Sequence, residues 1–150
     1  MSDLPVSDLP ASPVPQGRYA AAVVVGGLAY SAGMTPRRDG VLTVVGLVGE
    51  DVDVPAAAAA AGLAATNALV AVAEAAGGLD RIERCVRMTV YVACAEGFTV
   101  LSAVADGASA VLAERLGEPA LPVRAAVGVR ALPGGAPVEV ELSAAVKAGT

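Results

Sequence analysis

Alternation of apolar residues with small or polar ones in residues 120–146 is the feature that most constrains what this chain can fold into. The alternation covers residues 123–131, is broken by Leu-Pro-Gly-Gly at 132–135, and resumes over residues 137–146. A period of two residues is typical of a β-strand with one buried face, and a Pro-Gly-Gly break is typical of a turn. The segment therefore predicts two strands around a turn, and we expect the chemistry of the protein here.

Two charged side chains of this segment are candidates for a functional pair. Arg124 lies among small residues on the first strand, and its planar, permanently charged group suits a carboxylate or phosphate. Glu139 lies among apolar neighbours after the turn, where burial favours the protonated carboxyl and makes it a candidate general base. The alternatives are a structural ion pair at Arg124 and a solvated strand residue at Glu139.

The strand pattern separates these two side chains if the strands pair directly. Successive side chains of a strand point to opposite faces. A direct hairpin with its apolar faces together puts Glu139 beside Arg130. Arg124 then lies about six residues along, roughly 20 Å away at about 3.3 Å per residue. Either the strands are not direct neighbours, or another subunit completes the site.

Composition limits the class of protein. A chain of 150 residues is long enough for one domain with a real core. The hydrophobic fraction is 55%, much of it alanine, with only 3% aromatic residues, so we expect part of the apolar surface to form an oligomer interface. The net charge of −5, without a Lys/Arg cluster, argues against a nucleic-acid partner.

The absence of histidine from the sequence excludes whole classes of site. Ser-His-Asp and Cys-His nucleophiles, imidazole bases and His-ligated zinc all need that residue. The two cysteines, Cys85 and Cys94, lack the spacing of a metal knuckle or a thioredoxin-type motif. We expect them to be reduced core thiols of a cytoplasmic protein that uses no metal or other cofactor.

The N-terminal part predicts a flexible arm followed by short strands. Residues 1–16 are rich in proline, repeat Ser-Asp-Leu-Pro and lack the pattern of a secretory signal. Residues 20–31 are apolar around a Gly-Gly pair and predict two short buried strands; Tyr19, just before them, is expected either to pack or to face a ligand. Residues 37–40 predict a surface turn with a solvated arginine pair, and residues 41–48 a short strand.

Two helices and a longer strand are expected in the middle of the chain. Residues 56–76 are alanine-rich between the N-cap candidate Asp53 and a Gly-Gly pair, and predict a helix that lies on a sheet. Alanine is barely hydrophobic and polar residues interrupt the run, so we expect no membrane partner. Residues 99–116, before Gly117, predict the second helix.

The strand expected over residues 84–93 alternates cleanly. The alternation assigns Val86, Met88, Val90 and Val92 to one face, and Cys85, Arg87, Thr89 and Tyr91 to the other. The second face is moderately polar, and we expect it to meet another subunit.

Several motifs along the chain carry a family resemblance. They are residues 17–19, 30–36 and 86–91, Phe98 with the helix after it, Arg124 followed by Leu132-Pro133, and residues 138–141. Together with the order of the elements, they resemble the Rid family, also known as YjgF/YER057c/UK114 or endoribonuclease L-PSP. Residues 106–109 and 127–129 are most similar to a poorly characterised branch of that superfamily.

The resemblance implies an α+β, chorismate-mutase-like fold over residues 17–147, with a tail at 148–150. In that fold two helices pack on one face of a mixed β-sheet, and a homotrimer encloses a cleft at each subunit boundary. Members hydrolyse small 2-imino acids to 2-keto acids and ammonia. By resemblance Arg124 holds the substrate carboxylate, Glu139 holds the attacking water, and Tyr19, Gly33 and the backbone at Ala126 line the cleft.

Three departures from the family pattern fall in the implied cleft. Ala32-Gly33-Met34 stands where the family often has Ser-Gly-Gln, Ala126 replaces a common cysteine, and Asp106 replaces an asparagine. We therefore count Met34 and Asp106 among the substrate-binding positions, and expect the charge of Asp106 to oppose an anion if it faces the cleft.

The sequence leaves three functions open. The first is an imine or enamine deaminase, since a protonated imine needs only an anchored substrate and a positioned water. The second is a non-catalytic trimer that binds small carboxylates or partner proteins. The third is a pathway-specific tailoring or hydrolytic enzyme that uses the same cleft. None of these requires a nucleic acid or a membrane.

Overall fold

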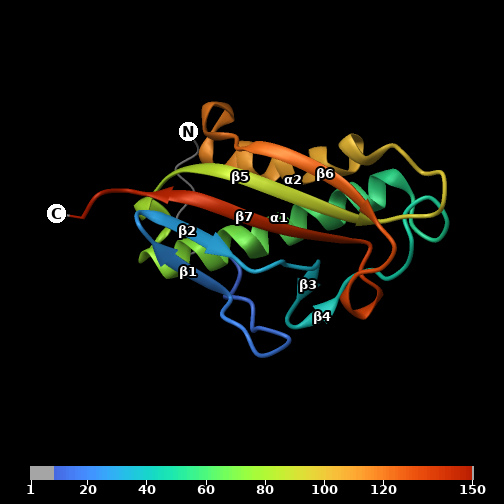
Figure 1. Ribbon diagram of the computed structural model, residues 1–150, viewed down its shortest axis with the longest axis horizontal. Coiled ribbons are helices and arrows are strands. Elements are labelled where there is room, and N and C mark those ends of the chain that lie inside the picture. Colours follow the sequence, from blue (N-terminus) through green and yellow to red (C-terminus); the bar gives the residue numbers. More distant parts are fainter. Residues whose placement is uncertain (1–8, 150) are drawn as a thin grey trace.

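A five-stranded mixed β-sheet with two helices on one face forms the body of the protein (Figure 1). The computed structural model describes residues 9–149. The strand order is β1-β2-β7-β5-β6; β5 and β6 run parallel, and the other neighbours run antiparallel. The strands are β1 (Ala22–Val25), β2 (Leu28–Ser31), β5 (Ile82–Ala93), β6 (Val123–Val129) and β7 (Val138–Val146).

The remaining elements connect and cover this sheet. The helices are α1 (Val54–Ala76) and α2 (Leu101–Leu116). A separate two-stranded ribbon consists of β3 (Arg37–Arg38) and β4 (Val41–Leu42), joined by the predicted turn. Three short 3₁₀ turns are η2 (Leu79–Arg81), η3 (Glu118–Ala120) and η4 (Pro133–Gly135). The α+β arrangement of two helices on one face of a mixed sheet is the one expected.

The two predicted C-terminal strands both form, but they do not pair with each other. β5 lies between them, parallel to β6 and antiparallel to β7. Tyr91 of β5 is paired with Glu139 on one side and with Val127 on the other. The direct hairpin is therefore excluded, and the alternative that the strands are not neighbours is correct.

Helix α1 starts and ends as the sequence predicts. The Asp53 carboxylate accepts a hydrogen bond from the Ala56 N–H at 2.9 Å, which caps the first turn. Gly77 ends the helix with φ 100°, a left-handed conformation that costs glycine little. The helix is long and apolar enough to cross a membrane, yet 72% of its most apolar window is buried inside the protein. Packing thus accounts for its composition.

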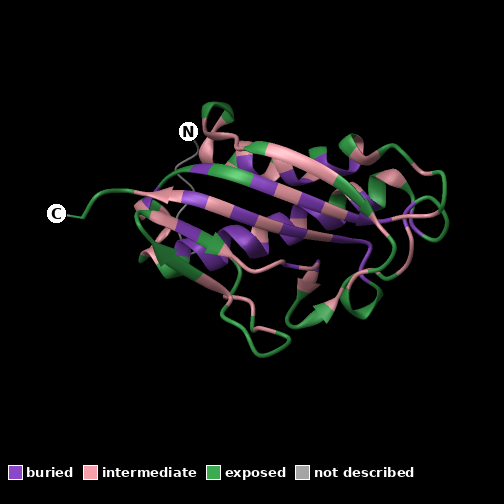
Figure 2. Cartoon of the chain, viewed as in Figure 1, coloured by how far each residue is buried: buried purple, intermediate pink, exposed green. Residues whose placement is uncertain are grey.

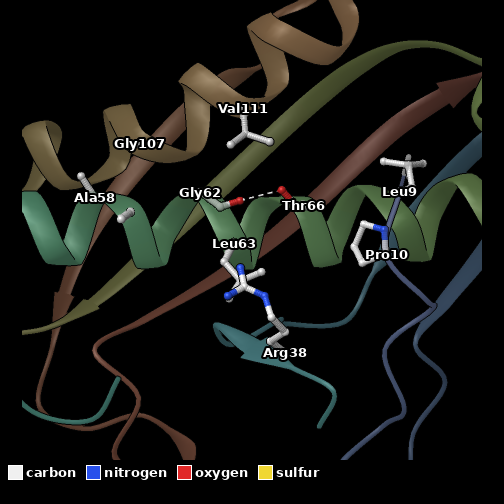
Figure 3. Close-up of a pocket in the computed structure, with 10 residues that line it drawn as sticks. Leu9, Pro10, Arg38, Ala58, Gly62, Leu63, Thr66, Gly107 and Val111 are labelled. Carbon is white, nitrogen blue, oxygen red and sulfur yellow. Dashed lines mark hydrogen bonds between the residues drawn. The ribbon is translucent and has the colours of Figure 1, made fainter. Parts of the chain in front are cut away.

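Small residues let the two helices approach backbone to backbone. A Cβ placed on Gly107 of α2 would overlap the carbonyl oxygen of Ala58 on α1, and one on Gly62 would crowd Val111. Figure 3 shows this crossing, with Ala58 and Gly62 facing α2. In this alanine-rich core, close approach of the two helix backbones fills the space that large side chains fill in other proteins.

The alternation assigned to β5 fails at its first half. A β-bulge between Cys85 and Arg87 shifts the register, so that Cys85 is buried and Val86 is 37% exposed, the reverse of the prediction. Beyond the bulge, Met88, Val90 and Val92 are buried as expected. Burial raises the pKa of the Cys85 thiol to about 12, which leaves it protonated and unreactive.

The sheet face opposite the helices is uncovered in residues 9–149. One row of paired residues crosses all five strands, namely Val23, Tyr30, Ser143, Arg87 and Val123. Val23, Tyr30 and Val123 are 47%, 44% and 60% exposed. Figure 2 shows β1 largely exposed, whereas buried and partly buried bands alternate along β7. The expectation that the first two strands are buried is therefore wrong for β1, because the helices cover only the other face.

Asn67 is a buried side chain that joins α1 to the segment after β2. It is 5% exposed, and its Nδ2 donates to the carbonyl oxygens of Thr35 at 3.1 Å and Arg37 at 3.0 Å. Both acceptors belong to the backbone that leads into β3. In the sequence Asn67 only interrupts an apolar run, whereas in the fold its side chain holds the backbone of Thr35 and Arg37 against α1.

We predict that Asn67→Ala lowers the free energy of unfolding by about 1–3 kcal/mol, because two buried carbonyls lose their donor. Thr66→Ala on the same helix is the control, since within residues 9–149 the Thr66 hydroxyl bonds only to the Gly62 carbonyl one turn back. That change is expected to stay within about 0.5 kcal/mol. Urea unfolding measures both; equal effects of the two substitutions would contradict the role given to Asn67.

Candidate functional site

Glu139 lies in a hollow of about 280 Å³ built from segments that precede β1, follow β2 and precede β7. We call it the Glu139 hollow. Its lining residues are Gln16, Tyr19, Ala32, Gly33, Thr35, Arg37, Pro133 and Glu139. An acid, an aromatic hydroxyl and a guanidinium thus share one concave surface within a single chain.

The backbone after β2 brings Gly33 directly against Glu139. Met34 and Val140 exchange two backbone hydrogen bonds of 2.8 Å, which extends the pairing with β7 beyond the end of β2. A Cβ placed on Gly33 would overlap Glu139 Oε1. Only glycine leaves room for the carboxylate in this position, and this contact explains why Gly33 belongs to the site.

The environment of Glu139 favours its protonated form. Burial raises the pKa of its carboxyl above the usual range, and the charge of Glu141 raises it further. Glu141 itself accepts a 2.8 Å hydrogen bond from the Tyr91 hydroxyl. That bond, followed by burial and the two carboxylates, raises the pKa of Tyr91, so the hydroxyl remains a donor. Glu139 is thereby suited to take a proton.

Tyr19 stands at the mouth of the same hollow. Its hydroxyl oxygen accepts a 3.0 Å hydrogen bond from the Gln16 N–H, and the residue is 49% exposed. Tyr19 thus lines the hollow, and its role as a ligand-facing ring remains a prediction.

Arg124 belongs to a second, separate group of polar side chains on β6 and α2. Its Nη1 donates to Asp106 Oδ1 at 2.8 Å and to Ser109 Oγ at 2.9 Å. Its Nη2 donates to Ser102 Oγ at 2.8 Å, with the Ser102 carbonyl at 3.5 Å. The Arg124 side chain is 20% exposed and the Asp106 side chain 70% exposed. We call these four residues the Arg124 cluster.

The Glu139 hollow and the Arg124 cluster lie on opposite faces of the sheet. Arg124 is paired with Met88, whose side chain is buried under the helices, and it contacts α2. Glu139 alternates with buried Val138 and Val140, so it points to the uncovered face. The two residues are also three positions and two strands apart, roughly 10 Å in each direction at about 3.3 Å per residue and 4.8 Å per strand. One chain does not bring them together.

The structure divides the predicted site residues between these two places. Tyr19, Gly33 and Glu139 share the hollow. Asp106 contacts Arg124, and Ala126 lies two residues along the same face of β6. Met34 reaches neither place. Its side chain is only 7% exposed and packs in the core, so its assignment to the cleft wall is corrected.

Sequence reasoning named Asp106 but missed other residues of both groups. Ser102 and Ser109 were missed, although with Asp106 they have a spacing of i, i+4 and i+7 that places all three on one stripe of α2. That stripe was the available signal for the Arg124 cluster. Arg37 was expected to be solvated with Arg38, yet it lines the Glu139 hollow, its Nη1 donates to the Gly40 carbonyl at 2.8 Å, and its Nε is buried without a partner among residues 9–149.

A larger hollow, about 610 Å³, lies elsewhere, against α1 and α2 (Figure 3). It is shallow and lined mainly by small or apolar residues, such as Ala58, Leu63 and Val111. Of the described residues that line it, Arg38 alone is charged. It offers no acid or base, so the smaller Glu139 hollow is the better candidate. In residues 9–149 no three His, Cys, Asp or Glu side chains lie close enough together to hold a metal ion.

Comparison with known proteins agrees with this architecture. The sequence profile of the family described as endoribonuclease L-PSP matches residues 10–146. The protein TCP17 of Trypanosoma cruzi is 36% identical over 137 residues, which cover 89% of this chain and 84% of TCP17. The crystal structure of Atu1372 from Agrobacterium tumefaciens, a protein of unknown function, superposes with a TM-score of 0.83 at 38% identity, and covers 88% of this chain and 85% of that one. The YjgF gene product of E. coli gives a TM-score of 0.66 at 26% identity, with 91% and 96% covered.

We predict that Glu139 titrates above the ordinary glutamate range of about 4.3 in an NMR titration of its side-chain carboxyl carbon. Glu141→Gln is expected to lower this pKa in part, because it removes the neighbouring charge. Gly33→Ala is expected to lower it further, since the added methyl group pushes the carboxylate toward solvent and burial is the larger cause. An unshifted wild-type titration, or one that neither substitution moves, contradicts this description of the hollow.

Proposed function

Because the chain belongs to the endoribonuclease L-PSP family and has the YjgF-type fold, we propose that it hydrolyses imines and enamines to carbonyl compounds and ammonia. The reaction takes place in a cleft where the Glu139 hollow of one copy meets the Arg124 cluster of another. Small 2-imino acids are the substrates that the family resemblance implies. The observation that carries the proposal is Glu139, a half-buried carboxylate with a raised pKa, held against Gly33 beside an exposed tyrosine.

Self-association is supported by two features of the single chain. The uncovered sheet face presents exposed apolar side chains on three of its five strands, Val23 on β1, Tyr30 on β2 and Val123 on β6, and exposed apolar patches are typical of protein interfaces. The two groups of polar residues lie on opposite faces, so a site that uses both needs a second copy. A closed ring of three identical chains supplies every copy with the same contact.

The chemistry requires one base and one anchored electrophile. Glu139, as carboxylate, accepts a proton from water while the water oxygen bonds to the carbon of the protonated imine. The resulting carbinolamine carries a hydroxyl and an amino group on one carbon. Proton transfer from the Glu139 carboxyl to that nitrogen lets the C–N bond break, ammonia leaves, and loss of the hydroxyl proton completes the carbonyl. Water and imine are consumed in equal amounts, and Glu139 ends as it began.

RNA cleavage, the activity in the family label, is a weaker proposal for this chain. The net charge of −5 disfavours a polyanion, and the sequence contains no histidine for imidazole acid-base catalysis. Glu139 and Glu141 lie close together on β7, and their charges oppose a phosphate backbone on that face. Hydrolysis of a small imine needs neither a positively charged surface nor a histidine.

We predict that the protein accelerates keto-acid release from 2-iminobutanoate generated in situ from threonine by a dehydratase. Glu139→Gln is expected to lower kcat by about 100-fold or more, the usual effect of losing a general base. Arg124→Ala is expected to raise KM for this acid roughly tenfold, because a charged hydrogen-bond donor is lost. Glu141→Gln, which removes a carboxylate of the same strand, is the matched control and should keep at least a third of the activity.

Two outcomes of this experiment count against the proposal. Failure to accelerate the hydrolysis of several imino acids removes the imine hydrolase and leaves a non-catalytic binding trimer or another reaction. Acceleration that Glu139→Gln does not change removes the mechanism given for Glu139.

The raised pKa of Glu139 also predicts a pH dependence. The carboxylate is the active form of the base, so kcat/KM should rise with pH through the pKa of Glu139 and then level off. The midpoint should lie above the ordinary glutamate value of about 4.3. Glu141→Gln should move the midpoint down, because it removes a charge that raises that pKa. A midpoint that Glu141→Gln leaves unchanged, or moves up, contradicts the assignment.

A further inference from the structure

Both terminal nitrogens of the Arg124 guanidinium already have acceptors within their own chain. An arginine binds a carboxylate most strongly through two parallel N–H groups of its planar fork. Here Nη1 has two acceptors, Asp106 Oδ1 and Ser109 Oγ, and Nη2 has the hydroxyl and the carbonyl of Ser102. An incoming carboxylate therefore meets a guanidinium that already has an anionic partner.

Asp106 differs from the two serines in how it can respond. Its side chain is 70% exposed, and Arg124 is its one side-chain hydrogen-bond partner among residues 9–149, so it can turn into solvent without disturbing the core. Ser102 and Ser109 then continue to hold Arg124 against α2. Even when displaced, the carboxylate of Asp106 remains on the turn of α2 that faces Arg124, and its charge opposes any anion bound at Arg124.

We propose that Asp106 is a specificity-determining residue, an internal carboxylate that competes with the substrate carboxylate for Arg124. The proposal rests on the imine hydrolase function above and names its substrate class. Imines that carry no carboxylate beside the reacting carbon do not need to displace Asp106, whereas 2-imino acids do. The ratio of kcat/KM for a carboxylate-free imine to kcat/KM for a 2-imino acid is therefore higher in this protein than in a variant whose residue 106 is neutral.

The size of the effect follows from exposure. The Asp106 side chain is largely exposed, so the loss of its ion pair and the loss of its repulsion of a bound anion each change carboxylate affinity by a small factor. We expect a combined effect of roughly fivefold to tenfold, which corresponds to about 1–1.4 kcal/mol. A neutral amide at position 106 removes both contributions while it keeps an oxygen that can accept from Nη1. Asp106→Asn is thus the sharpest variant, and Asp106→Ala, which removes the acceptor as well, is the second.

Direct binding tests the inference without reference to catalysis. Propanoate, a small inert carboxylate, is titrated into the full-length protein and followed by amide chemical shifts. Asp106→Asn is expected to bind propanoate roughly fivefold to tenfold more tightly than the unaltered protein, and Asp106→Ala at least threefold. Glu114→Gln, which removes one negative charge from an exposed position on the same helix, is the matched control and should change nothing.

A second arm identifies the anchor. Arg124→Ala combined with Asp106→Asn is expected to abolish the gain. A gain that survives without Arg124 means that another cation, such as Arg37 in the Glu139 hollow, binds the carboxylate, and this overturns the proposal. Equal affinity in Asp106→Asn and in the unaltered protein also overturns it, as does a failure of every variant to bind propanoate.

A matched pair of substrates extends the test to turnover. Oxidation of leucine by an amino-acid oxidase and of 3-methylbutylamine by an amine oxidase yields two imines that differ only by the carboxylate. Asp106→Asn should raise kcat/KM roughly fivefold to tenfold for the imino acid and leave the other imine within twofold. Inertness of all variants toward both imines, with propanoate binding still tightened by Asp106→Asn, refutes the proposed function and retains the inference about Asp106. An equal change for both imines refutes the inference alone.

Discussion

The structure depends on one constraint, that helices cover a single face of a five-stranded sheet. Each strand then alternates between a buried side and an uncovered one, and this alternation decides where the charged residues point. Glu139 is directed to the uncovered face and Arg124 to the helix face at the edge strand β6. The insertion of β5 between β6 and β7 separates them further. A site that needs both residues requires a second copy of the chain, and the exposed Val23, Tyr30 and Val123 on the uncovered face offer an apolar surface for that contact.

Small residues and hydrogen bonds fix the position of the charged side chain in each half of the proposed site, Glu139 in one half and Arg124 in the other. Gly33 lets the Glu139 carboxylate sit half-buried against backbone, and burial raises its pKa. Asn67 holds the segment between Thr35 and Arg37 that forms another wall of the same hollow. On the other face, Ser102, Ser109 and Asp106 fix the direction of Arg124. The ion pair between Arg124 and Asp106 is the one such pair within residues 9–149, and it lies at the predicted substrate anchor.

Elements with a strong local pattern were predictable, and contacts between distant segments were not. The caps at Asp53 and Gly77 and the strands around residues 132–135 follow from side-chain chemistry within a few residues. The bulge that exchanges Cys85 and Val86 has no local signal, because it depends on pairing with β7. Met34 was misplaced because a residue beside Gly33 on an extended segment points to the opposite side, into the core. Arg37 was missed because the wall it joins is assembled from segments about a hundred residues apart. Side-chain chemistry within residues 120–146 selected Arg124 and Glu139 as a candidate pair, and the family resemblance added the roles expected of them.

The measurement that tests the shared site most directly is complementation between two impaired variants, assayed at a substrate concentration well below KM, where each alone has little activity. Arg124→Ala and Glu139→Gln chains are refolded together in equal amounts and assayed for 2-imino acid hydrolysis. If each site takes Glu139 from one chain and Arg124 from another, about one quarter of the interfaces of a random mixture hold both intact residues, and about one quarter of the unaltered activity returns. Arg124→Ala mixed with the double variant is the control and should recover none. Activity of the mixture no higher than the average of the two variants would show that the two halves do not form one site.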